Sequence, residues 1–169
     1  MIFNWDGMKT LLLLSFLFVL AACNNQNSDN HQLQTQVDSL QKKLNDTYKP
    51  GLGEFMLGIQ LHHAKLWFAG TNKNWKLADF EVHEIGETLD DIKKYCTDRP
   101  EIKSIGVIDP AIQSINAAIK KKDLQLFKNG FAELTTNCNN CHKSNQHEFN
   151  IITIPTALPV VNQEFKPIK

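Results

Sequence analysis

Apolar residues recur every three or four positions through most of the chain beyond residue 51, which is the spacing of amphipathic helices. We predict helices over about residues 52–68 and 74–95, separated by a turn at residues 70–72. The first helix should bury a stripe with a histidine at its centre: Leu52, Met56, Ile59, His63 and Leu66. The second should bury a stripe that ends on a cysteine: Ala78, Val82, Ile85, Leu89, Ile92 and Cys96.

Two further helices should follow a connection over residues 99–107. Asp109 and Pro110 are a typical helix start, with Asp as N-cap and Pro at the first position, and three lysines at 120–122 close that helix. Asp123 should cap the last helix, whose apolar seam runs to about residue 144: Leu124, Phe127, Phe131, Leu134, Cys138 and Cys141. Four such helices predict an all-α fold, an antiparallel four-helix bundle over residues 51–145.

The pattern changes at both ends of this predicted bundle. Leu33, Val37, Leu40 and Leu44 form a narrow seam at coiled-coil spacing, which would pair two copies in a homodimer or fold back on the bundle. A proline and two glycines at residues 50–53 end this helical extension and mark the domain boundary. Residues 146–169 contain three prolines and an apolar run, so we expect an extended C-terminal tail packed across the bundle surface or the edge of a bound group.

The first 22 residues have the pattern of a signal peptide, with Met8 a more natural start than Met1. The segment 20–23 (LAAC) resembles a bacterial lipoprotein box, and this resemblance implies cleavage before Cys23 and a lipid on its thiol. The alternative is an ordinary cleaved signal with an incidental cysteine. With a lipid at Cys23, residues 24–30 would be a polar tether, and the domain would be exported, membrane-anchored and facing the periplasm or the cell surface.

Charge and composition narrow the classes of function. The 169 residues include 18 basic and 18 acidic ones, so nothing indicates a nucleic-acid partner, and the exported part fits one domain. Glu81, His83, Glu84 and Glu87 lie close together on the second helix. A di-metal bundle needs a Glu-x-x-His pair on each of two helices, and this segment has none. We therefore interpret His83, Glu84 and Glu87 as a solvated face, with Glu81 placed to hydrogen-bond inward.

The strongest chemical signal is the segment 138–142 (CNNCH), which is the attachment pattern of a c-type haem. The thiols of Cys138 and Cys141 can add to the two vinyl groups, and His142 can bind the iron as the proximal ligand. A structural zinc site needs a second ligand pair, which the remaining cysteines, Cys23 and Cys96, do not form. A thioredoxin-like pair opens a helix after a strand, whereas this pair closes a helix. One covalent haem c is therefore the expected cofactor.

The sequence leaves three arrangements open for the sixth coordination position of the iron, opposite His142. In an antiparallel bundle the start of the first helix lies beside the end of the last, which brings Met56 and His63 toward His142. These two residues are about 10 Å apart along their helix, so both cannot bind one iron. Met56 is the candidate sixth ligand, His63 is the alternative, and a five-coordinate iron is the third arrangement. Gln60 would lie in the distal pocket.

Residues 52–145 resemble the class II, four-helix-bundle cytochromes c, which include cytochrome c prime and the cytochromes c556. Class I cytochromes carry the motif near the N-terminus and a methionine after it, and no methionine follows His142 here. The segments 60–70 and 74–87 are also similar to a group of exported monohaem proteins. The resemblance implies a one-electron carrier with an unidentified redox partner protein. The alternative is a gas-binding or sensing haem protein; a peroxidase-like enzyme is disfavoured because no acid–base pair is identifiable.

Overall fold

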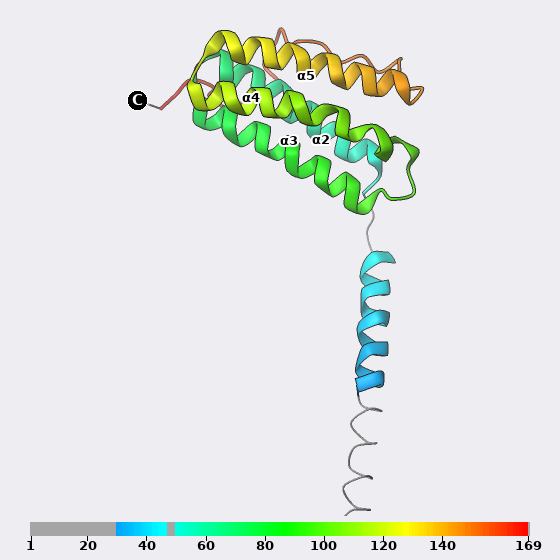
Figure 1. Ribbon diagram of the computed structural model, residues 1–169. Coiled ribbons are helices and arrows are strands. Elements are labelled where there is room, and N and C mark those ends of the chain that lie inside the picture. The colour runs from blue at the N-terminus through cyan, green and yellow to red at the C-terminus, as the bar shows by residue number, and fades with distance from the viewer. Residues whose placement is uncertain (1–29, 47–49, 169) are drawn as a thin grey trace, which may run out of the picture. The chain divides into compact units, whose positions relative to one another are not determined.

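The computed structural model describes residues 30–46 and 50–168, and its contacts divide the chain into two units, Met1–Lys49 and Pro50–Lys169. The predicted all-α fold is confirmed, since the described residues form helices and no strand (Figure 1). The predicted signal peptide, Cys23 and the first residues of the tether lie outside the described residues. No described helix has both the length and the apolar character needed to cross a bilayer.

Helices α2 (Leu52–Thr71) and α3 (Trp75–Tyr95) form an antiparallel hairpin. The turn between them lies at Asn72 and Lys73 rather than at residues 70–72, because Gly70 and Thr71 remain helical. Gly70 is needed there, since a Cβ atom at this position would collide with the ring of Phe127. Asn74 then caps α3 by accepting a hydrogen bond from the backbone of Leu77.

The connection before the third bundle helix is itself helical, which sequence patterning did not predict. Residues Pro100–Ile108 form a 3-10 helix, η1, that runs directly into α4 (Asp109–Lys121). The prediction of Asp109 as an N-cap is therefore wrong, because Asp109 already has helical angles (φ −55°, ψ −41°) and its side chain caps no backbone N–H. Asp123, by contrast, accepts hydrogen bonds from the backbone of Gln125 and Leu126 and caps α5 (Leu124–Ser144), as predicted.

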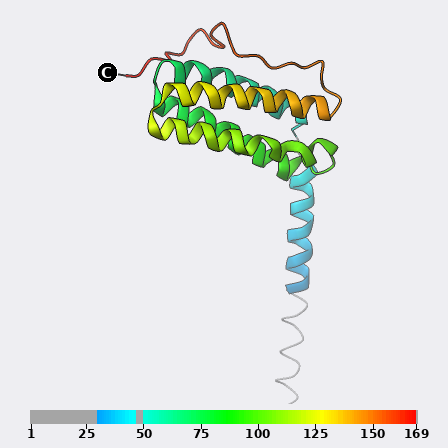
Figure 2. The same ribbon diagram turned by 45° about the horizontal axis from the view of Figure 1, so that its top comes forward.

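Helices α2 to α5 lie side by side and alternate in direction (Figures 1 and 2). The predicted stripe of α3 is buried throughout, from Ala78 to Cys96. Phe127 and Phe131 of α5 are completely buried, with ring centroids 6.1 Å apart, and Trp67 packs on Phe131 at 4.9 Å. These contacts join α5 to the α2–α3 hairpin and fix the side of α5 that faces inward.

The C-terminal tail is extended along the bundle, and it is anchored at both ends. Ile152 packs against the core near the end of α5. Phe165 is buried farther along, 5.8 Å from the ring of Phe68, and the side chain of Asn74 donates to the carbonyl of Lys166. The tail is therefore part of the folded unit.

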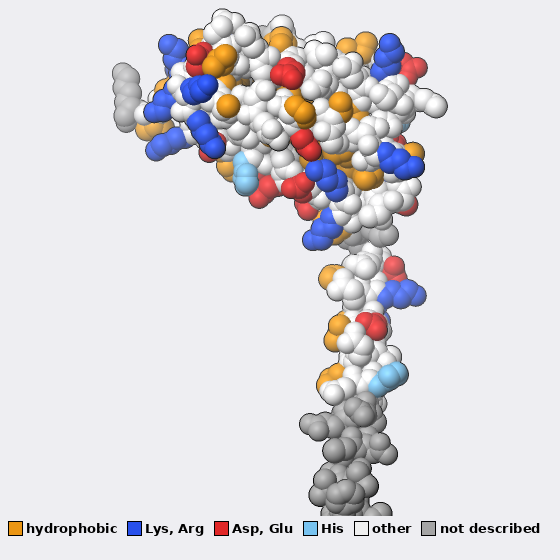
Figure 3. All heavy atoms as spheres, in the orientation of Figure 1, with side chains coloured by type: hydrophobic (Ala, Val, Ile, Leu, Met, Phe, Trp, Pro, Cys, Tyr) orange, Lys and Arg blue, Asp and Glu red, His pale blue; other side chains and the backbone are white. Residues whose placement is uncertain are grey.

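The helix over residues 30–46 belongs to the first of the two units. Its seam of Leu33, Val37, Leu40 and Leu44 is exposed along one side, which the space-filling view shows as a row of apolar side chains (Figure 3). The predicted homodimer through this seam stays a prediction.

Candidate functional site

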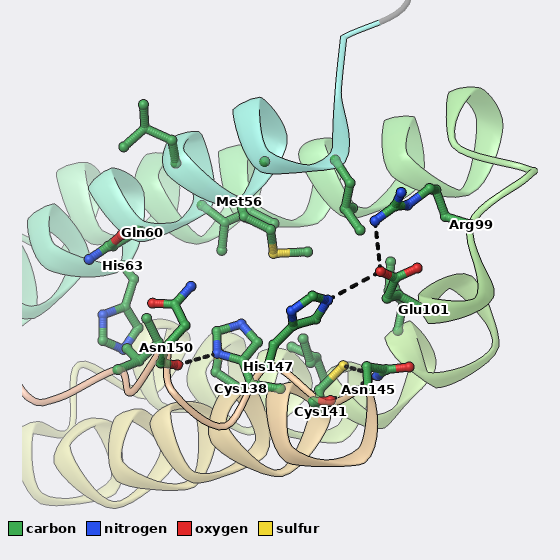
Figure 4. Close-up of a pocket in the computed structure, with 18 residues that line it drawn as sticks. Met56, Gln60, His63, Arg99, Glu101, Cys138, Cys141, Asn145, His147 and Asn150 are labelled. Carbon is green, nitrogen blue, oxygen red and sulfur yellow. Dashed lines mark hydrogen bonds and ion pairs between the residues drawn. The ribbon is translucent and has the colours of Figure 1, made fainter.

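A cavity of about 580 Å³ lies between α2, η1, α5 and the start of the tail (Figure 4). Its volume falls in the range of about 300–1,000 Å³ that is typical of cofactor and ligand sites. The structure brings every described candidate residue to this one cavity: Met56, Gln60, His63, Cys138, Cys141 and His142. Residues separated by some 80 positions in the sequence therefore share a single site.

The α5 wall carries both thiols, because Cys138 and Cys141 continue the apolar seam at helical spacing. Each cysteine is only 8% exposed, and neither forms a disulfide. Burial raises the pKa of the Cys138 thiol to about 11 and also raises the pKa of Cys141. Redox-active cysteines depend on a lowered pKa, so this environment disfavours a thioredoxin-like pair and suits a pair of neutral thiols.

His142 follows on the same helix and has a defined tautomer. Its Nδ1 atom lies 2.6 Å from the backbone carbonyl oxygen of Asn150 in the tail. A carbonyl oxygen only accepts hydrogen bonds, so Nδ1 must carry the hydrogen, and the lone pair of the neutral ring is on Nε2. Histidines that bind metals generally donate their other ring N–H in this way. His142 is therefore prepared to bind a metal through Nε2.

The two candidate sixth ligands on the α2 wall differ in burial and in their contacts. Met56 is half-buried, and Figure 4 shows its thioether directed into the cavity. His63 is 3% exposed, its ring packs on Phe131 at 4.4 Å, and its Nε2 lies 2.9 Å from Oγ1 of Thr135. Gln60, between them in sequence, is exposed at the cavity rim.

The tautomer of His63 follows from the partners of Thr135. The Thr135 hydroxyl donates to the carbonyl of Phe131, 2.9 Å away, so it accepts from Nε2–H of His63. Burial lowers the pKa of His63 to about 4, so the ring is neutral at neutral pH. His63 is thus held as a structural donor between α2 and α5.

Polar residues at the other end of the cavity were missed by sequence reasoning. Glu101 of η1 is buried, and its Oε1 accepts from Arg99 at 2.9 Å and from His147 at 3.2 Å. A hydrogen bond from its own backbone, together with these two donors, lowers the pKa of Glu101. Its Oε2 is buried without a hydrogen-bond partner among the described residues. No periodic signal marks these positions, because they come from a connection and a tail.

The predicted carboxylate cluster on α3 lies outside the cavity. His83 and Glu87 are exposed and pair with each other at 3.2 Å, as expected for a solvated face, whereas Glu84 is half-buried and lies 4.0 Å from Nε2 of His62. Glu81 points inward, is completely buried, and lies 2.7 Å from Nδ1 of His62. Among the described residues, no three His, Cys, Asp or Glu side chains are grouped as ligands of a metal ion.

The cavity therefore combines two buried neutral thiols, the imidazole of His142 with its lone pair on Nε2, and a largely apolar lining that includes Leu52, Ile105 and Ile108. This donor set suits a haem that is attached through sulfur, because the porphyrin supplies four of the iron ligands and the protein needs to add only one or two. No model of a known protein family, no curated protein and no solved structure matches the chain.

Proposed function

We propose that this chain is a monohaem c-type cytochrome of the class II, helical-bundle kind, which carries single electrons while tethered to a bacterial membrane and facing the periplasm or envelope. The observation that carries the proposal is the convergence of the Cys138 and Cys141 thiols with His142 on one cavity. Cys138 and Cys141 would hold haem c by thioether bonds, and His142 would be its proximal ligand. When bound, the haem supplies the one-electron chemistry.

The residues of the chain set the conditions for that chemistry. The hydrogen bond to Asn150 keeps a proton on Nδ1 of His142, so the ring presents Nε2 to the iron. The apolar lining keeps water away from the site, and the lower local dielectric disfavours the more highly charged ferric state relative to the ferrous state. Met56 is the favoured sixth ligand, since its thioether extends into the cavity while the ring of His63 is held in place by Thr135 and by its packing on Phe131.

A gas-binding or sensing haem protein is the second candidate, and the engagement of His63 is the observation that favours it. If Met56 does not bind the iron, and His63 stays on Thr135 without turning its Nδ1 lone pair to the iron, the sixth position stays open. Gln60 at the rim and the neutral His63 would then be the polar residues nearest to a bound gas molecule.

The test is production of the full chain in a host that matures c-type cytochromes. We expect a Soret band and the added mass of one haem, and both should disappear in the Cys138→Ala, Cys141→Ala double variant. Cys96→Ala is the matched control, because Cys96 is also buried but is not part of the cavity lining. A reduced spectrum unchanged by carbon monoxide supports the carrier, and one that shifts with carbon monoxide supports the gas-binding alternative. A wild-type chain without haem rules out both.

The membrane attachment is a separate part of the proposal. It depends on the lipoprotein box at Cys23, which lies outside the described residues. Cys23→Ala should abolish labelling with a fatty-acid analogue and lower the fraction of the protein that sediments with membranes. Wild-type protein that is unlabelled and found entirely in the soluble fraction would contradict the anchor and leave the haem proposal intact.

A further inference from the structure

The two asparagines inside the CNNCH motif have different surroundings. Asn140 is exposed, whereas Asn139 is half-buried and contacts the tail. The side-chain amide of Asn139 donates from Nδ2 to the carbonyl of Ile152 and accepts at Oδ1 from the N–H of Ile152, both at 2.8 Å. One side chain thus satisfies both backbone groups of a single tail residue, as a neighbouring strand would.

This clamp lies two residues from the contact that orients His142. The carbonyl of Asn150 accepts from Nδ1 of His142 at 2.6 Å. The same loop is closed at its start, where the N–H of His147 donates to the carbonyl of His142, and inside, where the N–H of Asn150 donates to the carbonyl of His147. Beyond Ile152, Val160 packs against the core, and among the described residues the next hydrogen bond between the tail and the bundle joins Asn74 to the carbonyl of Lys166. Asn139 is therefore the side chain on α5 that holds the outgoing end of this loop.

We propose that Asn139 is a positioning residue for His142: by clamping Ile152 it keeps the Asn150 carbonyl on Nδ1, and so fixes the tautomer and basicity of the imidazole. The inference rests on the proposed function, in which His142 is the proximal ligand of a haem iron. An acceptor on the outer nitrogen makes the ligating nitrogen more electron-rich. A more electron-rich Nε2 stabilises the ferric over the ferrous state and keeps the reduction potential low.

Removing the clamp should therefore have an electronic effect that a purely structural contact lacks. In Asn139→Ala the tail loses both hydrogen bonds at Ile152, and the Asn150 carbonyl can leave His142. The reduction potential should rise, by about 59 mV for each tenfold loss in the preference for ferric over ferrous iron. In Asn139→Asp one oxygen still accepts from the N–H of Ile152, so hydrogen exchange at the Ile152 amide should be intermediate, and this variant remains measurable if Asn139→Ala fails to mature.

The experiment compares the haem-loaded wild type with Asn139→Ala, Asn139→Asp and the matched control Asn140→Ala. Three quantities are measured: the reduction potential, the exchange rate of the His142 ring Nδ1 proton by NMR, and hydrogen exchange at the Ile152 amide. Asn139→Ala should raise all three, and Asn140→Ala should leave all three at wild-type values.

Two results overturn the inference. In the first, Ile152 remains protected in Asn139→Ala, which means that the clamp does not hold the tail. In the second, Ile152 exchanges freely while the potential and the ring proton match those of Asn140→Ala, which means that the clamp does not act on His142. A wild-type chain without haem instead contradicts the proposed function, and Ile152 exchange in that haem-free chain still reports on the clamp.

Discussion

Nε2 of His63 lies 2.9 Å from Oγ1 of Thr135, and this contact joins α2 to α5 across 72 positions of sequence. This contact separates Met56 from His63, which helix geometry alone leaves as alternative sixth ligands of the proposed haem iron. For His63 to bind through Nε2 it must give up a buried hydrogen bond and its packing on Phe131. Leaving the Thr135 acceptor without its donor costs about 1–3 kcal/mol. Met56 has no such competing hydrogen bond in the structure.

Substitution of Met56 should therefore change the iron spectrum, whereas substitution of His63 should not. Met56→Ala removes the methionine sulfur that lines the cavity, so we expect a high-spin reduced spectrum that responds to carbon monoxide. His63→Gln retains a donor for Thr135, and its visible spectrum should match the wild type. The measurement is the reduced spectrum with and without carbon monoxide. A wild-type spectrum in Met56→Ala together with an altered one in His63→Gln would reverse the assignment.

His63 should also make the stability of the fold depend on pH. Its pKa is about 4 in the folded state and about 6.5 when unfolded, so the unfolded chain binds the extra proton first. The contribution is fully present above pH 6.5 and is lost as the pH falls toward 4, amounting to about 3 kcal/mol at the acid limit. Denaturant unfolding of the wild type between pH 7 and 4 should show this loss.

The matched variant for the pH effect is His63→Gln, which cannot titrate. Its free energy of unfolding should change much less than that of the wild type between pH 6.5 and 4.5. Below about pH 4.5 both proteins should lose stability together, because the lowered pKa of Glu101 acts in that range. Equal slopes for the two proteins above pH 4.5 would show that His63 is not the responsible group.

The spacing of apolar residues in the sequence predicted the buried faces of helices α3 and α5. The stripe of α3 is buried as expected, and so is the seam of α5 from Phe127 to Cys141, while Leu124 at its start is half-buried. Apolar residues on a helix that covers a core must repeat about every 3.6 positions. The pairing of Glu101 with His147 spans 46 positions, and the clamp of Asn139 on Ile152 involves irregular backbone. Such contacts are set by tertiary placement and leave no local pattern. Asp109 fails as a cap for the same reason, since η1 continues into α4 where a loop was expected.

Glu81 and Glu87 lie on the same helix but should differ strongly in their contribution to stability. Glu81 is completely buried against His62, whereas the side chain of Glu87 is 62% exposed. Breaking a buried pair by removing one partner typically costs about 3–5 kcal/mol. Because Nε2 of His62 still faces solvent and Glu84, we expect the lower end of that range for Glu81→Ala. Glu87→Ala should change the free energy of unfolding by no more than about 0.5 kcal/mol. Comparable losses in the two variants by chemical denaturation would show that the buried contact of Glu81 with His62 does not stabilise the fold.

Gly70 and Gly86 offer the last comparison, because both are helical glycines and only one is at a close contact. A Cβ at position 70 would occupy the space of the Phe127 ring, which is itself completely buried and cannot move without displacing Phe131 and Trp75. Gly70→Ala should therefore destabilise the fold by about 1–3 kcal/mol, the usual cost of overpacking. A Cβ at position 86 in α3 meets nothing within 4 Å. Gly86→Ala should therefore stabilise the fold by about 0.5–1 kcal/mol, because alanine has a higher helix propensity than glycine. Chemical denaturation of both variants in the same haem state measures the difference, and a neutral Gly70→Ala would mean that α2 and α5 do not approach each other at Phe127.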